Sequence, residues 1–274
     1  MQQTTSNLSA SIERSPLIIA HRGASAFAPE NTLAAFDLAL AHGADGIEFD
    51  VRLSADGVPV VIHDADLRRV GGRRELISSL TAAALSECDV GSWFNRQFPS
   101  VATGKYGAQR IPTLEQFLSQ HSRGKKLYLE MKADKALNPQ LVREIAQLID
   151  RFNLREDVTV LSFDLTGIKL LKEVDAGIRT GALFQPRLFR AGSPLLKATM
   201  IRRALAVGAA EIALNRLLAT PRIINDAQSA GLKVVVWTVD NPAWLEFAGR
   251  LGVHAIITNN PRAMRAGSTQ IAKR

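Results

Sequence analysis

The sequence predicts an α/β fold, a (β/α)8 TIM barrel with a small insertion after the second strand. Eight short runs rich in β-branched residues alternate with segments of helical periodicity almost from end to end, which is typical of a parallel sheet covered by helices. The 274 residues, 46% of them hydrophobic, suffice for one such barrel. Only one stretch interrupts the alternation. An open doubly wound sheet is the alternative, but eight units fit the barrel without surplus.

The expected strands and helices follow one another along the chain. The strands are predicted at residues 17–20, 46–53, 126–132, 158–163, 180–184, 211–214, 233–239 and 253–258. The helices are predicted at residues 32–41, 139–152, 166–174, 194–207, 221–230 and 243–251, several of them with a capping residue before or a glycine after. No long helix is expected after the second strand.

The interruption begins at residue 54. Ser54-Ala55-Asp56-Gly57 is a turn signal and residues 58–62 are predicted as a returning strand, so that a hairpin brings His63 over the mouth of the barrel. Residues 64–110 contain several glycines and only one short helical segment, at residues 81–87. We expect an inserted subdomain on the C-terminal face, where the catalytic groups of such barrels gather.

Composition limits the classes of function. Residues 1–15 are predicted to be a disordered tail before a single domain at residues 16–274, and no apolar run resembles a signal peptide or a membrane span. The net charge of +8 favours an anionic substrate, but the basic residues are too scattered to indicate nucleic acid. The lone Cys88 fits a reducing compartment. We therefore expect a cytoplasmic protein with no stable membrane insertion and no nucleic-acid partner.

Carboxylates on neighbouring strands indicate a metal site. Glu48 and Asp50 are two positions apart in one strand, so their side chains point to the same face. The next barrel strand repeats the pattern with Glu130 and Lys132. Because the ligands are oxygens, the expected cofactor is one divalent cation, Mg²⁺ or Ca²⁺. One such pattern would more simply be a structural ion pair, but two on adjacent strands favour a site.

Two histidines flank the first carboxylate pair in the sequence. His21 follows the first strand and His63 follows the returning strand, while Arg22 offers a planar fork suited to a phosphate. Because imidazole titrates near neutral pH, we expect the two histidines to act as an acid and a base, in an order that the sequence leaves open. The remaining histidines are expected to have surface or structural roles: His42, His121 and His254.

Taken in order, these motifs resemble the signature of the glycerophosphodiester phosphodiesterases. The resemblance rests on His21-Arg22-Gly23, Pro29-Glu30-Asn31-Thr32, Gly46-Ile47-Glu48-Phe49-Asp50-Val51, His63-Asp64, Gly91-Ser92-Trp93-Phe94, Ile111-Pro112-Thr113-Leu114-Glu115, Glu130-Met131-Lys132 and Val236-Trp237-Thr238-Val239. It extends over nearly the whole chain, and the order and spacing of the pieces make it specific.

The resemblance implies a metal-dependent barrel enzyme that hydrolyses small glycerophosphodiesters to sn-glycerol 3-phosphate and an alcohol through a cyclic phosphate. By match to the family motifs, Glu48, Asp50 and Glu130 would hold the cation, His21 and His63 would be catalytic, and Arg22, Lys132 and Trp237 would bind the substrate and its phosphate. Core packing is the alternative role for Trp237. Asn31 is interpreted as a helix cap.

The chain departs from the family pattern at two places. Asn259 stands where many relatives have Asp, and we expect this change to alter a hydrogen bond near the site. Arg69-Val70 stands where threonines are usual, inside the predicted insertion, and is expected to bear on substrate preference. Neither change removes an expected ligand or base.

Two other functions are weighed against this one. A cyclising or lysophospholipase D-type phospholipase could use the same barrel, but the compact insertion and the lack of an apolar docking segment disfavour it. A catalytically inactive barrel that only binds a polyanion would be expected to lack at least one of the expected site residues. All seven of these residues are present: His21, Arg22, Glu48, Asp50, His63, Glu130 and Lys132. The substrate head group, the choice of metal and the oligomeric state are left open by the sequence.

Overall fold

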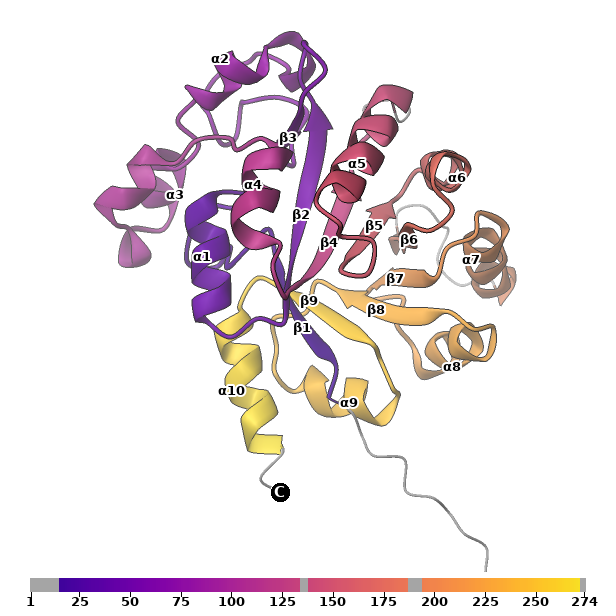
Figure 1. Ribbon diagram of the computed structural model, residues 1–274. Coiled ribbons are helices and arrows are strands. Elements are labelled where there is room, and N and C mark those ends of the chain that lie inside the picture. The colour runs from indigo at the N-terminus through magenta and orange to yellow at the C-terminus, as the bar shows by residue number, and fades with distance from the viewer. Residues whose placement is uncertain (1–14, 134–137, 187–193, 272–274) are drawn as a thin grey trace, which may run out of the picture.

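The computed structural model describes residues 15–133, 138–186 and 194–271. Nearly all of the predicted N-terminal tail lies outside these residues. In the described part of the chain, eight parallel strands form a closed barrel with helices on its outside, as Figure 1 shows. The barrel strands are β1 (Leu17–His21), β2 (Gly46–Leu53), β4 (Lys126–Met131), β5 (Val158–Ser162), β6 (Arg179–Phe184), β7 (Glu211–Asn215), β8 (Lys233–Trp237) and β9 (Ala255–Thr258).

Hydrogen bonding between the strands closes the sheet. The neighbours run in the order β1, β9, β8, β7, β6, β5, β4, β2, and β2 pairs in parallel with β1 through the register His21↔Glu48. A doubly wound sheet would leave two open edges, so the barrel prediction is confirmed. The predicted strands agree with the observed ones to within two residues at each end.

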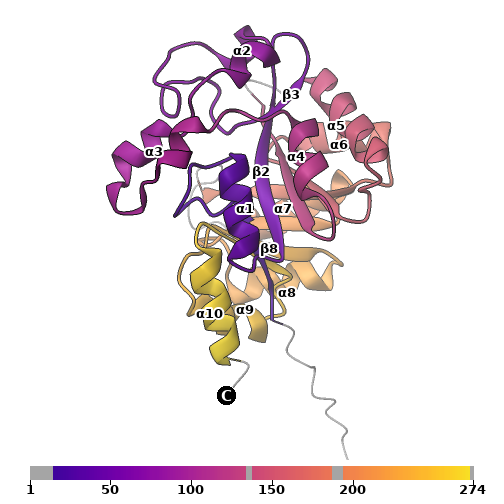
Figure 2. The ribbon, with the colours of Figure 1, turned by 60° about the vertical axis from the view of Figure 1, so that its left-hand side comes forward.

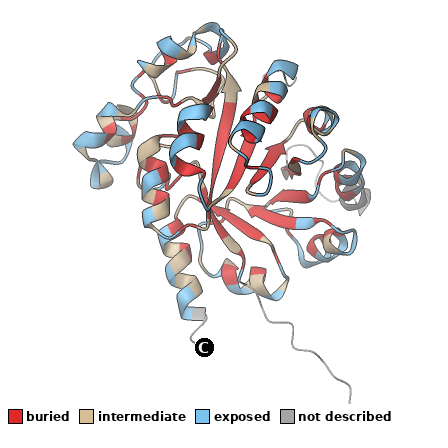
Figure 3. Cartoon of the chain, in the orientation of Figure 1, coloured by how far each residue is buried: buried red, intermediate tan, exposed pale blue. Residues whose placement is uncertain are grey.

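The helices cover the barrel from outside. They are α1 (Leu33–Ala41), α4 (Leu114–His121), α5 (Pro139–Arg151), α6 (Leu165–Val174), α7 (Pro194–Ala206), α8 (Pro221–Ser229), α9 (Trp244–Arg250) and α10 (Pro261–Ile271). Figure 3 shows buried strands and helices that expose only their outer faces. The sequence analysis omitted two of these helices, α4 and α10.

Alternate residues of each strand face opposite ways. One set packs against the helices, for example Phe49 of β2, whose ring centroid lies 4.1 Å from that of Phe117 in α4. The other set fills the barrel and forms an inner apolar layer made of Ile19, Tyr128, Leu161, Leu183, Ala213, Val235, Ala255 and Ile257. The second set also includes Glu48, Asp50 and Glu130, because they share its parity along β2 and β4. The carboxylates therefore point into the barrel.

The stretch between β2 and α4 begins with the expected hairpin. Strand β3 (Pro59–Val61) pairs antiparallel with β2. Short helices follow: 3₁₀ turns at Ile77–Ser79, Pro99–Val101 and Gly104–Ala108, and the helices α2 (Ala82–Ser86) and α3 (Ser92–Gln97). The expectation of a single helical segment here was wrong, because α3 and the 3₁₀ turns are too short to show a periodic pattern.

This stretch docks beside α1, as Figures 1 and 2 show. Val60, Ile62, Leu67, Val70, Ile77, Leu85, Cys88, Val90 and Ile111 form a small core of its own. The hydroxyl of the buried Tyr106 donates to the Phe27 carbonyl at 2.8 Å and so ties the stretch to the loop after β1. The division at residues 64 and 110 stays a prediction.

Among the described helices, none combines the length and apolarity that crossing a membrane requires.

Candidate active site

Three carboxylates meet inside the barrel at the C-terminal ends of β2 and β4. Glu48 and Asp50 come from β2, and Glu130 lies beside Asp50 in the strand register. All three are buried, and one oxygen of each lies within 4.8 Å of the others. The structure thus brings together the three metal ligands expected from the sequence.

Two cations accompany the carboxylates. Lys132 Nζ lies 2.6 Å from Glu130 Oε1 and 3.0 Å from Asp50 Oδ1. Arg22 Nε lies 3.1 Å from Asp50 Oδ2, and its Nη1 donates to Glu30 Oε1 at 2.8 Å. Asp50 therefore stands between both cations. Arg22 and Lys132, expected to bind phosphate, are paired with acids here.

Asn31 is not a helix cap, which corrects the sequence interpretation. The cap of α1 is Thr32, whose hydroxyl accepts from the Ala35 amide. Asn31 has a positive φ of 56°, and its amide donates to Asp50 Oδ2 at 2.8 Å while its carbonyl accepts from the Asp50 backbone at 3.3 Å. It therefore holds the central carboxylate from a second direction.

The pKa values of the three acids are shifted in different directions. Burial raises the pKa of Glu48 well above its usual value, and the Asp50 and Glu130 charges add to the effect. Burial alone would also raise the pKa of Asp50, but Lys132 and Arg22 outweigh it and hold that pKa well below the usual range. Burial raises the pKa of Glu130 despite its contact with Lys132. Three buried acids beside two bases leave an excess of negative charge that a cation would relieve.

The donor set fits a hard divalent cation. It consists of carboxylate oxygens alone, as Mg²⁺ and Ca²⁺ prefer. Asp50 Oδ1 is also buried and has no hydrogen-bond partner, although it lies near Lys132 Nζ. A buried, incompletely satisfied carboxylate oxygen is what a metal ligand looks like before its ion binds.

His21 ends β1 beside this cluster. Its Nε2 lies 3.8 Å from Glu48 Oε2, and its Nδ1 lies 2.7 Å from Asn259 Oδ1. The Asn259 amide nitrogen donates to Asp240 Oδ2 at 2.8 Å, so Oδ1 faces the histidine. The hydrogen-bond network therefore assigns the proton to Nδ1 and leaves Nε2 to accept one. Burial, helped by the Arg22 charge, lowers the pKa of His21 to about 4.

His63 follows the β2–β3 hairpin. The Ile62 amide donates to the Asp50 carbonyl at 2.9 Å, and the His63 carbonyl accepts from Arg52 Nε at 2.8 Å. These two bonds hold the hairpin end beside the C-terminal half of β2. The His63 Nδ1 lies 2.7 Å from Asp64 Oδ1, which accepts a hydrogen bond from it.

Trp237 ends β8 on the inner side of the barrel. Its indole nitrogen donates to the Ala213 carbonyl at 3.2 Å, and its ring meets the ring of Phe163 edge to face at 5.6 Å between centroids. It packs at the edge of the inner apolar layer. This position is compatible with both roles expected for Trp237, contact with the substrate and packing of the core.

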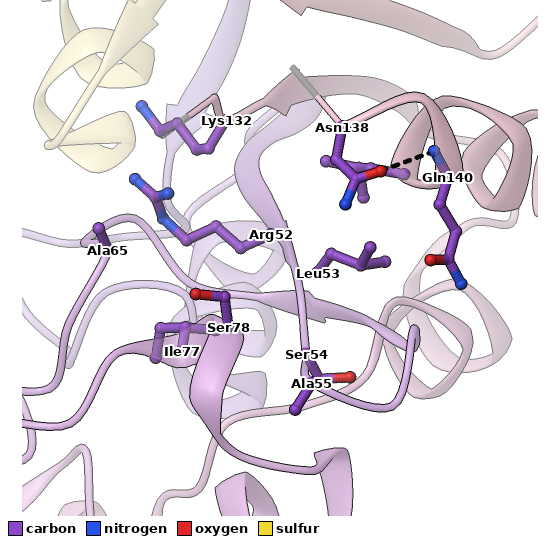
Figure 4. Close-up of a pocket in the computed structure, with 11 residues that line it drawn as sticks. Arg52, Leu53, Ser54, Ala55, Ala65, Ile77, Ser78, Lys132, Asn138 and Gln140 are labelled. Carbon is purple, nitrogen blue, oxygen red and sulfur yellow. Dashed lines mark hydrogen bonds between the residues drawn. The ribbon is translucent and has the colours of Figure 1, made fainter. Parts of the chain in front are cut away.

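A cavity of about 210 Å³ has Lys132 in its wall. It lies between the β2–β3 hairpin, the 3₁₀ turn at Ile77–Ser79 and the start of α5, and Figure 4 shows Lys132 and Arg52 at one side with Asn138 and Gln140 at the other. Lys132 borders both the cavity and the acidic cluster. None of the three carboxylates is among the residues that line the cavity, and neither is His21 or His63.

The other three histidines lie away from this cluster. His42 caps the C-terminus of α1, and His121 is buried with its Nε2 2.9 Å from Asp37 Oδ1. His254 precedes β9 at the N-terminal end of the barrel, where the Leu17 amide donates to its carbonyl. Burial and nearby basic residues lower its pKa to about 4. All three make structural contacts in these positions.

The contacts of several residues around the site were not predicted from the sequence. Asp240 orients Asn259, and Arg69 reaches from the inserted stretch to Glu30 and Asp64. Glu30 belongs to a motif noted in the sequence, but its two arginine partners are separated from it by 8 and 39 residues. No periodic pattern connects such positions.

Comparisons with known proteins agree with this architecture. The model of the glycerophosphoryl diester phosphodiesterase family matches residues 21–263. The glycerophosphodiester phosphodiesterase of Caldanaerobacter subterraneus is 31% identical over 249 residues, which cover 90% of this chain and 96% of that protein. Two solved structures are similar. A phosphodiesterase from Oleispira antarctica, in complex with the product sn-glycerol-3-phosphate, is 26% identical, with a TM-score of 0.80 and coverage of 93% and 97% of the two chains. A glycerophosphodiester phosphodiesterase from Agrobacterium tumefaciens is 28% identical, with a TM-score of 0.75 and coverage of 92% and 99%.

Proposed function

Because the chain belongs to the glycerophosphoryl diester phosphodiesterase family, we propose that it hydrolyses glycerophosphodiesters to sn-glycerol 3-phosphate and an alcohol. The observation that carries this proposal is the buried cluster of Glu48, Asp50 and Glu130 with the His21 imidazole beside it. The Oleispira relative, solved with sn-glycerol-3-phosphate, supports the identity of the product.

The three carboxylates would hold one Mg²⁺ or Ca²⁺ ion. When bound, such an ion supplies positive charge that stabilises the charge developing on the phosphoryl oxygens. Arg22 and Lys132, which neutralise Asp50 and Glu130 here, would bind the phosphate oxygens of the substrate.

The two histidines would act as base and acid in turn over two steps of the reaction. In the first, His21 takes the proton of the glycerol 2-hydroxyl while that oxygen bonds to phosphorus, and His63 gives a proton to the oxygen of the departing alcohol. In the second, water attacks the cyclic phosphate, the bond from phosphorus to the 2-oxygen breaks, and the roles reverse. The network supports this order, since Nε2 of His21 is free to accept a proton and the Asp64 carboxylate stabilises positive charge on His63.

The direct test uses purified protein and a panel of diesters. With Mg²⁺ or Ca²⁺, we expect release of sn-glycerol 3-phosphate from glycerophosphocholine or glycerophosphoethanolamine, and chelation should stop it. Lysophospholipids belong in the same panel, because their cleavage without that of the deacylated diesters would favour the phospholipase alternative. If folded, metal-loaded protein leaves the whole panel intact, the proposal fails.

A further inference from the structure

Arg69, in the inserted stretch, contacts two acids: Glu30 in the loop after β1 and Asp64, which directly follows His63. Its Nη1 and Nη2 donate to the two oxygens of Glu30 at 2.8 and 2.7 Å, and its Nε donates to Asp64 Oδ2 at 2.7 Å. The guanidinium also lies 5.4 Å from the centroid of the Trp93 ring. One side chain thus makes three charge-assisted hydrogen bonds and one cation–π contact.

Each of these acids has a second partner in the candidate active site. Asp64 Oδ1 accepts from His63 Nδ1 at 2.7 Å, and Glu30 Oε1 accepts from Arg22 Nη1 at 2.8 Å. Arg69 is therefore connected through Asp64 to His63, the proposed proton donor. It is also connected through Glu30 to Arg22, which is proposed to bind the phosphate. Among the described residues, no other side chain hydrogen-bonds to both Glu30 and Asp64.

The geometry restricts both second partners. A carboxylate held at one oxygen by Arg69 can present its other oxygen in only one direction, so Asp64 sets the ring orientation of His63 and keeps the proton on Nδ1. The bidentate grip on Glu30 shares its negative charge between two arginines. Arg22 is consequently held less tightly than it would be by a carboxylate of its own.

We propose that Arg69 is a positioning residue of the hydrolysis, which fixes His63 through Asp64 and Arg22 through Glu30. This rests on the proposed function. Through Arg69, the docking of the inserted stretch and the alignment of the proton-transferring side chain become one structural unit. A lysine could contact one of the two acids but could not span both with a planar fork.

The test compares Arg69→Met and Arg69→Lys with Arg68→Met. Arg68 is the neighbouring arginine, its side chain is 69% exposed, and its contact is with Asp66 at 3.6 Å, so its removal takes away the same charge without touching the site. We expect Arg69→Met to lower kcat by about 10- to 100-fold, because small misplacements of a catalytic group have effects of this size. Arg69→Lys should recover little of the loss, and Arg68→Met should stay within about twofold of the wild type.

A double variant separates positioning from general stability. If Arg69 acts through Asp64, then adding Arg69→Met to Asp64→Asn should cost much less in kcat than Arg69→Met costs alone. Full additivity, or equal activity of the Arg69→Met and Arg68→Met proteins, would overturn the proposal. So would a loss of activity that appears only at temperatures where the Arg69→Met protein unfolds.

A spectroscopic measurement tests Arg69 even if the panel of diesters shows no turnover. In ¹⁵N-histidine-labelled protein at a pH at which the His63 ring is neutral, with the signal of His63 assigned by its loss in His63→Gln, the wild type should show the proton on Nδ1. Arg69→Met and Arg69→Lys should give a mixture of the two tautomers, while Arg68→Met should not. An unchanged tautomer in Arg69→Met contradicts the proposal independently of the proposed function.

Discussion

At the scale of single residues, the site is a balance between buried acids and the two bases beside them. Asp50 touches both Arg22 and Lys132 and stays ionised, while burial and like charge raise the pKa of Glu48. The same strand thus carries two carboxylates with opposite pKa shifts, set by which neighbour is a cation. Such separation of pKa values is a mark of functional sites.

The role of His63 predicts a specific loss of activity. His63→Ala should lower kcat by about 10²- to 10⁴-fold, because a positioned proton donor contributes about this much. His42→Ala removes a histidine that caps α1 away from the cluster, and it should keep wild-type kcat. Steady-state assays on both proteins check this, and comparable activity of the two would rule out a catalytic His63.

The carboxylate cluster predicts stabilisation by the metal. At a Mg²⁺ or Ca²⁺ concentration 100 times its dissociation constant, the free energy of unfolding should rise by about 2.7 kcal/mol. Glu48→Gln should remove most of this gain, whereas Glu87→Gln, on the exposed cap of α2, should not. Thermal unfolding with metal or chelator at constant ionic strength measures the effect, and an undiminished gain in Glu48→Gln would contradict it.

The site residues that lie on strands or at their ends were predictable from the two-residue alternation of side chains along a strand. Glu48, Asp50, Glu130 and Lys132 were predictable because a strand sends every second side chain to one face. The contacts of Asn31, Asp240 and Arg69 were not predictable, because they depend on loop conformations and on the pairing of distant segments. Asn31 is an example: asparagine is a common helix-capping residue, but the positive φ of Asn31 directs its side chain toward β2 instead.

At the scale of elements, the strands were predictable and some helices were not. Helix α4 has only eight residues beside an irregular stretch, too few for the period to stand out. Its Thr113–Gln116 capping box is, however, a readable start signal. Helix α10 likewise starts after Asn260, whose side chain accepts from the Ala263 amide, with Pro261 as its first residue.

Two glycines of the inserted stretch predict opposite outcomes. A Cβ on Gly91 would lie 1.7 Å from the Tyr106 carbonyl oxygen, whereas a Cβ on Gly104 would have nothing within 4 Å. Gly91→Ala should therefore lower the free energy of unfolding by about 1–3 kcal/mol, the usual cost of overpacking, and Gly104→Ala should not lower it. Urea unfolding of both proteins tests this, and equal stability would mean that the Gly91 backbone moves freely.

At the scale of the whole molecule, the barrel has ionisable groups at both ends. At the barrel end opposite the carboxylate cluster, Glu211 is 1% exposed and accepts from the Thr159 hydroxyl at 3.2 Å. Lys233 and Arg179 act on it from neighbouring strands, and Tyr128 faces it. Burial nevertheless raises the pKa of Glu211.

This raised pKa predicts a pH-dependent stability. The folded state holds the Glu211 proton more tightly than the unfolded chain, so its stabilising contribution is complete below the unfolded pKa and is lost as the pH rises through the folded pKa. Glu211→Gln does not titrate, so it should gain stability relative to the wild type as the pH rises above 4.5, the ordinary pKa of Glu, by about 1.4 kcal/mol for each unit of pKa shift. Unfolding of both proteins across this range measures the difference, and a constant difference would disprove it.

The inner apolar layer, which includes Ile19 on β1 and Ile257 on β9, also separates the two ends of the barrel in space. It keeps the charge of Glu211 and its basic neighbours apart from the acids of the active site. Substitutions at the two ends should then act independently. The molecule accordingly has one end where charges can be redesigned for solubility or heat resistance, while the proposed catalytic residues lie at the other.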